Sequence, residues 1–189
     1  MSYVERMPPL DAARMTEVQR AAAAELAAGP RGGVKGPFIA LLRSPELMST
    51  LQKVGEYLRF RSSLEPRVSE FLMLIVSRQW TQQFEWAVHL PLALDAGVKR
   101  ETIEALAAGR RPTGMATDEA TAYDFCMELG ATRGVSDATY RQAVDHLGER
   151  GVIDMLGVVG YFTTMSMVLN VAHTPPASAS AIPLPTLPR

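Results

Sequence analysis

Apolar residues recur at helical spacing along most of the chain, and no stretch shows the sustained alternation of apolar and polar residues that marks a strand. Glycine, proline, serine and threonine fall between the periodic stretches, where helices usually begin and end. The pattern therefore predicts an all-α protein. Helices are expected at residues 11–28, 45–62, 66–80, 82–96, 100–108, 117–131, 136–148 and 149–172.

The helix at 66–80 has an almost wholly apolar middle, F-L-M-L-I-V, so we expect it to be the central buried element. Ser44 is expected to cap the helix before it, and Thr81 the helix after it, which would end at Gly97 in the left-handed conformation. The inward stripe of the helix at 45–62 would consist of Leu47, Leu51, Val54 and Leu58.

Repeated proline ends the helical pattern after residue 173, because proline lacks a backbone donor and fixes φ. We therefore expect one helical domain at 1–173 and a Pro-rich tail at 174–189, which either lies extended over a neighbour or lacks order. The glycine-rich loop after the first helix, R-G-G-V-K-G-P, is expected to border a pocket.

Composition and charge narrow the function classes. A chain of 189 residues with 47% hydrophobic content has the usual size of one domain. Its formal net charge of −1 and the lack of a long Lys/Arg run provide no broad basic surface, so nucleic acid is not an expected partner. The first residues show no signal-peptide pattern, which predicts a cytoplasmic protein.

The most apolar stretch, residues 151–172, is long enough to raise the question of a membrane span. Asp154 and Asn170 interrupt it, so the sequence favours a buried helix or a subunit-interface helix and no membrane association.

The single cysteine, Cys126, excludes an intrachain disulfide and a Cys-x-x-Cys redox pair. Its setting, Y-D-F-C-M-E-L, is typical of an amphipathic helix. We therefore expect a buried structural thiol rather than a reactive one.

The strongest functional signal lies between residues 70 and 89. Gln82, Glu85 and His89 fall at i, i+3 and i+7 and would share one face of a helix, while Glu70 lies one helix upstream. Two carboxyl groups and an imidazole suit general acid and base catalysis. Two carboxyls in one site disfavour double ionisation, so one glutamate would act as acid and the other as base.

The same stretch resembles the carboxymuconolactone decarboxylase family. The alkyl hydroperoxidase D-like branch of that family has a glutamate, a Cys-x-x-Cys motif that begins twelve residues later, and a histidine four residues beyond the second cysteine. Glu70 and His89 match this frame, but Gln82 and Glu85 stand at the two cysteine positions. Further resemblance is seen in G-P-F-I-A-L-L-R-S-P-E-L, Y-L-R-F-R-S-S-L, E-W-A-V-H and A-G-V, so it covers roughly residues 36–108.

The resemblance implies an alkyl hydroperoxidase D-like helical bundle that forms a homo-oligomer: a dimer, trimer or hexamer. Thiol peroxidase or peroxiredoxin activity is disfavoured because neither Gln82 nor Glu85 can exchange sulfur. The resemblance instead implies a decarboxylase without an organic cofactor, of the kind used in aromatic compound catabolism. Its substrate would be a small carboxylated lactone or keto acid.

On this interpretation Glu70, Glu85 and His89 are the catalytic residues. The substrate-binding candidates are Gln82, Trp86, Arg59, Arg61 and Arg78, with the arginines as carboxylate ligands.

Several alternatives stay open from the sequence alone. Glu70 and His89 could be buried structural partners, or they and Glu85 could bind zinc or iron, although we expect no metal. Arg78 could cap its own helix end or pair with Glu70. The protein could also be a hydroperoxidase that acts through Cys126, or a noncatalytic protein that binds a small ligand.

Overall fold

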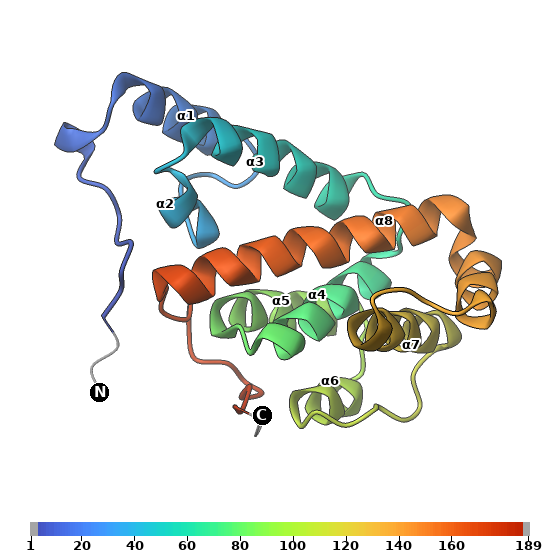
Figure 1. The fold of residues 1–189 in the computed structure, drawn as a ribbon. Coiled ribbons are helices and arrows are strands. Elements are labelled where there is room, and N and C mark those ends of the chain that lie inside the picture. The colour runs from blue at the N-terminus through green and yellow to red at the C-terminus, as the bar shows by residue number, and fades with distance from the viewer. Residues whose placement is uncertain (1–3, 187–189) are drawn as a thin grey trace.

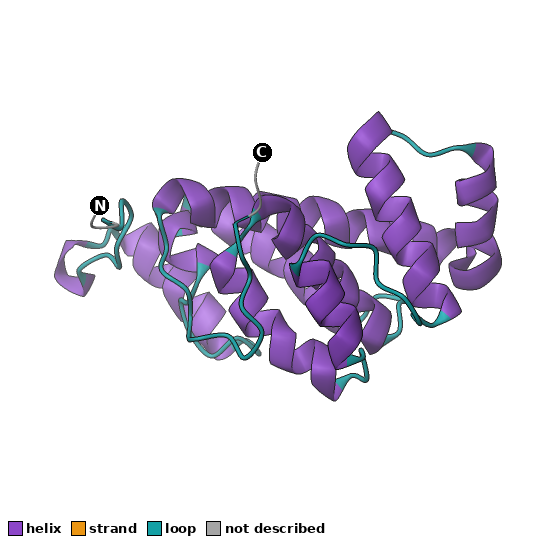
Figure 2. Cartoon of the chain, turned by 90° about the horizontal axis from the view of Figure 1, so that it is seen from below, coloured by secondary structure: helices purple, strands orange, loops and turns teal. Residues whose placement is uncertain are grey.

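The computed structural model describes residues 4–186. Every regular element in that part of the chain is helical, which confirms the all-α prediction (Figure 2). In chain order the elements are the 3-10 turn η1 (Ala12–Arg14) and the helices α1 (Glu17–Ala28), α2 (Pro37–Leu41), α3 (Pro45–Phe60), α4 (Pro66–Trp80), α5 (Gln83–Asp95), α6 (Arg100–Ala107), α7 (Thr117–Thr132) and α8 (Asp137–Ala172).

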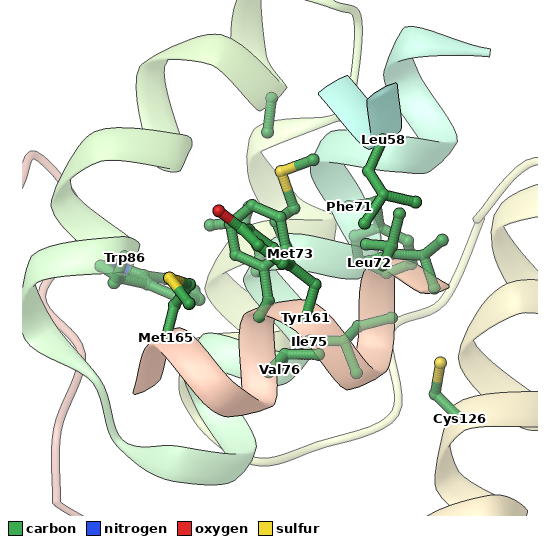
Figure 3. Close-up of a cluster of buried hydrophobic side chains, with 14 of the residues drawn as sticks. Leu58, Phe71, Leu72, Met73, Ile75, Val76, Trp86, Cys126, Tyr161 and Met165 are labelled. Carbon is green, nitrogen blue, oxygen red and sulfur yellow. The ribbon is translucent and has the colours of Figure 1, made fainter. Parts of the chain in front are cut away.

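Helix α8 runs through the middle of the molecule, with α1 and α3 on one side and α4 and α5 on the other (Figure 1). It packs against α2, α3, α4 and α7, and α4 also packs against α5, α6 and α7. The six residues 71–76 of α4 are completely buried and belong to the same hydrophobic core as Trp86 of α5 and Met165 of α8 (Figure 3). Helix α4 is therefore the central buried element, as predicted.

The ends of several helices differ from the prediction. Residues 11–28 contain two elements, because Thr16 forms a capping box with Gln19 and starts α1 afresh. Helix α2 was not predicted. Ser44 makes no side-chain cap hydrogen bond, and Thr81 ends α4 in the left-handed conformation instead of capping α5.

The inward face of α3 is rotated by about one residue from the predicted stripe. Its buried positions are Met48, Gln52, Gly55 and Leu58. Leu47 and Val54 are 49% and 42% exposed, so half of the predicted stripe is wrong. Helix α3 packs against both α1 and α8, and at Gly55 a Cβ atom would collide with Tyr161 Oη and Arg31 Nη2.

Helix α8 contains a break at Gly148, where φ is 69° and ψ is 165°, so the two helices predicted at 136–148 and 149–172 are confirmed. By length and composition α8 could cross a membrane, but half of its most apolar window is buried inside the protein. Met155, Val158, Met165 and Leu169 are in the core, whereas Ile153 and Leu156 remain exposed. The segment is thus a core helix of this fold.

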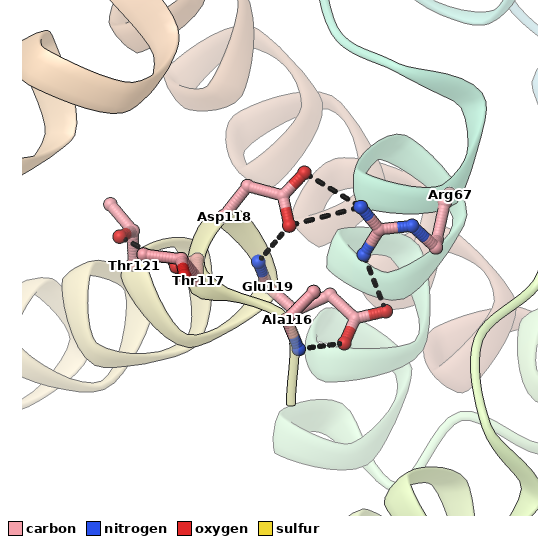
Figure 4. Close-up of polar contacts among 6 residues, drawn as sticks. All are labelled: Arg67, Ala116, Thr117, Asp118, Glu119 and Thr121. Carbon is pink, nitrogen blue, oxygen red and sulfur yellow. Dashed lines mark hydrogen bonds and ion pairs between the residues drawn. The ribbon is translucent and has the colours of Figure 1, made fainter. Parts of the chain in front are cut away.

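An ion cluster joins the start of α4 to the start of α7 (Figure 4). The guanidinium of Arg67 binds Asp118 and Glu119, each at 2.7 Å. Glu119 also accepts a hydrogen bond from the backbone of Ala116, which completes the cap of α7. Because the Glu119 side chain is only 3% exposed, its charge depends on Arg67 for compensation.

The described part of the tail, residues 174–186, lies extended over α4 and α5 of its own chain; residues 187–189 lie outside the described part. Ile182 and Leu184 are buried. Trp86 Nε1 donates to the carbonyl of Ile182 and Gln83 Nε2 to that of Leu184, both at 2.8 Å. The tail therefore supports the helix that carries the candidate site.

Candidate active site

His89 lies between two carboxylates. Its Nδ1 is 2.7 Å from Glu70 Oε2, and its Nε2 is 3.3 Å from Glu85 Oε2. Glu85 and His89 are one turn apart on α5, and the packing of α4 against α5 brings Glu70 to the other edge of the ring. The structure therefore brings together all three predicted catalytic residues.

Burial lowers the pKa of His89, but the hydrogen bonds and negative charges of Glu70 and Glu85 outweigh that effect, so the pKa is raised above its ordinary value. The His89 side chain is 3% exposed and that of Glu85 is 6% exposed. The protonated ring is thus stabilised in a site largely shielded from water. Such a ring can pass a proton from one carboxylate to the other.

A cavity of about 380 Å³ opens beside this triad. Glu85 and His89 line it, whereas Glu70 lies behind His89 and does not. The remaining walls come from residues 30–38, the end of α3, other residues of α5, the second half of α8, and Ala177 of the tail. The predicted contribution of the glycine-rich loop to a pocket wall agrees with this geometry.

The cavity also contains three basic residues and a phenol. Arg31, Lys35, Arg59 and Tyr161 all line it. Burial lowers the pKa of Arg31, and burial raises the pKa of Tyr161 to about 12. Arg59 was predicted to bind substrate, but Arg31 and Tyr161 were not. Arg31 lies in a loop and Tyr161 in an apolar stretch, so neither had a spacing signal.

Two other predicted substrate-binding residues lie outside the cavity lining. Gln82 accepts a hydrogen bond from the backbone of Phe84 and donates to Asn170 at 2.8 Å, which fixes the start of α5. Trp86 is fully buried in the core and binds the tail. Both residues stabilise α5, the helix that carries Glu85 and His89, and neither is placed to contact a ligand in this cavity.

Arg78 and Arg61 are also away from the cavity. Arg78 donates to the carbonyls of Ala107 and Pro185 and to Thr81, so it ties the end of α4 to the tail. Arg61 is exposed and forms an ion pair with Glu56. Of the three arginines predicted to hold a carboxylate, only Arg59 is placed to do so.

Cys126 lies on α7, apart from Trp86 and Tyr161 (Figure 3). It is 2% exposed, and burial raises the pKa of its thiol to about 12. The expectation of a buried thiol is confirmed, and this cysteine lacks the accessible thiolate that peroxide chemistry requires.

Within residues 4–186 no group of three or more His, Cys, Asp or Glu side chains has the arrangement of a metal site. Both nitrogens of His89 already face a carboxylate oxygen. A metal ligand needs a free nitrogen lone pair, and with Nδ1 donating to Glu70 only Nε2, which faces Glu85, could provide one.

Comparison with known proteins supports the resemblance seen in the sequence. Residues 45–126, which include Glu70, Glu85 and His89, match the model of the Carboxymuconolactone decarboxylase family. A search of curated proteins found no match.

A similar solved structure is the crystal structure of an alkylhydroperoxidase AhpD core, an uncharacterized peroxidase-related protein from Ralstonia eutropha JMP134. It has a TM-score of 0.73 and 16% sequence identity, and the match covers 90% of this chain and 91% of that one. At this level of identity the similarity concerns the fold alone. Residues 45–126 are therefore similar to the carboxymuconolactone decarboxylase family, and the whole chain has a fold similar to that of the alkylhydroperoxidase AhpD core.

Proposed function

We propose that this protein is an enzyme that transfers protons to and from a small carboxylic acid bound in the cavity. The observation that carries the proposal is that His89 contacts Glu70 through one nitrogen and Glu85 through the other, beside a 380 Å³ cavity. Glu85 faces the substrate, His89 carries the proton, and Glu70 holds the ring in orientation and stabilises its charge.

The specific reaction that we propose is decarboxylation of a carboxylated lactone or β-keto acid. The bond to the carboxyl carbon breaks, carbon dioxide leaves, and the electron pair passes to the neighbouring carbonyl as an enolate. A proton from the Glu85–His89 pair then forms the new C–H bond, and water restores the proton to the enzyme. The cationic cavity wall stabilises the negative charge that moves from the departing carboxylate to the enolate oxygen.

Carbon dioxide release is the direct test of this reaction. A panel of β-keto acids and carboxylated lactones, with γ-carboxymuconolactone among them, would be incubated with wild type and with the Glu85→Gln and His89→Gln variants. Each variant should lose at least about a hundredfold in turnover, the usual contribution of a general acid or base.

Matched controls are Glu101→Gln and His146→Gln, which make the same chemical changes at exposed positions. Full activity in both controls and loss in both site variants would support the assignment. Turnover in Glu85→Gln equal to that of wild type would remove Glu85 from the mechanism. No release from any member of the panel would refute the decarboxylase proposal.

The alternative functions are less well supported by this geometry. A thiol peroxidase would need Cys126 to ionise, and its burial opposes that. A noncatalytic protein would retain the cavity and show ligand-dependent melting without product. Homo-oligomeric assembly and a cytoplasmic location remain predictions, with Ile153 and Leu156 as exposed apolar residues that a second copy could cover.

A further inference from the structure

Three polar atoms around the cavity are buried without a hydrogen-bond partner among the described residues. They are Arg31 Nη2, Arg59 Nε and Tyr161 Oη. Nearly all buried polar groups in folded proteins are hydrogen-bonded, and a buried donor without a partner is costly, above all when it is charged. All three belong to residues that line one cavity, so a molecule bound there is the partner that small rotations of these side chains would bring within reach.

Gly55 shows how closely two of these groups approach α3. A Cβ atom at position 55 would lie 2.3 Å from Tyr161 Oη and 2.6 Å from Arg31 Nη2. Only a residue without a side chain leaves this space free, so glycine allows the phenol and the guanidinium to come together. The Arg31 guanidinium also lies over the Phe38 ring, 4.6 Å from its centroid, which holds it in place.

The charges around the cavity favour an anion. Two guanidinium groups and Lys35 line it, and among the described residues Glu85 is the only carboxylate in the lining. That carboxylate already faces His89. Burial raises the pKa of Tyr161, so its hydroxyl stays protonated and can donate a hydrogen bond.

We propose that Arg31, Arg59 and Tyr161 form a carboxylate-binding subsite in the cavity that Glu85 and His89 also line. A guanidinium presents paired N–H donors that match the two oxygens of a carboxylate, and a phenol adds a third donor. The rest of the lining is largely apolar and includes Phe38, Phe84, Val88 and Phe162. The occupant is therefore a small carboxylate with an apolar or ring-shaped body.

This inference rests on the proposed function, because the reaction would take place at the other end of the substrate. It also limits which substrates can react. A carboxylate that is paired with arginine is stabilised as an anion, which opposes its loss as neutral carbon dioxide. The carboxylate held by Arg31 and Arg59 is therefore not the leaving group. A substrate that is decarboxylated here carries two acid groups, one bound in the subsite and one beside Glu85.

Binding can be tested without any reaction, by calorimetric titration with benzoate and with its neutral analogue benzamide. Wild type should bind benzoate more tightly than benzamide by about tenfold or more, the value of a hydrogen-bonded charge pair. Arg31→Met should lose that preference, and Tyr161→Phe should weaken benzoate binding by about threefold to tenfold. Arg61→Met, at an exposed arginine outside the cavity, should bind like wild type.

Gly55→Ala provides a second variant: alanine favours a helix more than glycine does, but its Cβ would lie 2.3 Å from Tyr161 Oη, so circular dichroism and the melting temperature are measured beside binding. Its methyl group should displace Tyr161 and Arg31 and abolish benzoate binding while the helix content stays unchanged. Benzoate binding in Gly55→Ala equal to that of wild type, or equal binding of benzoate and benzamide by wild type, would overturn the subsite.

Two outcomes separate this inference from the proposed reaction. If Glu85→Gln and wild type both bind benzoate but no substrate is turned over, the subsite stands and the reaction is refuted. If turnover is observed but the KM of a diacid such as oxaloacetate is the same in Arg31→Met as in wild type, the reaction stands and the subsite is refuted. Preference for oxaloacetate over acetoacetate, lost in Arg31→Met, would support both.

Discussion

The Cys126→Ser substitution distinguishes the proton-transfer proposal from thiol peroxidase activity, and the structure predicts that it leaves peroxide consumption unchanged. The thiol is 2% exposed and burial raises its pKa to about 12, against an ordinary value of 9.0. At pH 8 about one such thiol in ten thousand would be ionised, compared with about one in ten for an ordinary cysteine. The native thiol should therefore react about a thousandfold more slowly than the thiol of the unfolded chain.

The assay follows the reaction of wild type with a disulfide reagent at pH 8, once in buffer and once in guanidinium chloride. Consumption of an organic hydroperoxide, with dithiothreitol as reductant, is then measured for wild type, Cys126→Ser and Cys126→Ala. The alanine variant controls for any loss of stability caused by a buried hydroxyl. Native labelling within tenfold of the unfolded rate, together with loss of peroxide consumption in both variants, would refute the reasoning and identify Cys126 as a reactive thiol.

Three further predictions concern stability. Burial lowers the pKa of His89 and the two glutamates raise it, for a net increase above 6.5. The stability that the charged ring provides is therefore fully present below pH 6.5 and is lost as the pH rises through the raised pKa. In unfolding titrations Glu85→Gln should move that loss to lower pH. Arg67→Ala leaves the buried carboxylate of Glu119 uncompensated and should lower the free energy of unfolding by about 3 kcal/mol in urea, whereas an equal stability would show that water screens the pair. Ile182→Ala removes three buried carbons and should cost about 2–3 kcal/mol, seen as a melting temperature lower by roughly 5–10 °C; an unchanged melting temperature would mean that the tail is not docked.

The sequence predicted the positions of most helices because apolar periodicity is a local property. The break at Gly148 and the left-handed Gly97, with φ of 97°, were predicted for the same reason. The inward face of α3 was wrong because neighbouring faces of that helix both carry apolar residues, and tertiary packing chose the face with Gln52 and Gly55. No hydrophobicity pattern predicts that a glycine faces inward because a phenol and a guanidinium occupy the space.

The sequence predicted about as much of the candidate site as it did of the fold. Glu85 and His89 are neighbours in one helix, so their spacing indicated a shared face, and the family frame added Glu70. The arginines were harder to assign, because Arg59 and Arg61 are only two residues apart and the exact end of α3, at Phe60, decides where each side chain points. Arg31 is brought to the cavity by a loop whose path depends on packing across the whole fold.

The residues in and behind the cavity wall come from inside and outside the segment that matches the family model. Glu70, Glu85, His89 and Arg59 lie inside the segment that matches the family, whereas Arg31 and Tyr161 lie outside it, one on each side. On the proposed function, related proteins would share the proton-transfer residues and still differ in the groups that select the substrate. Changes confined to residues before 45 or after 126 would then alter the acid that is bound and leave the match to the family intact.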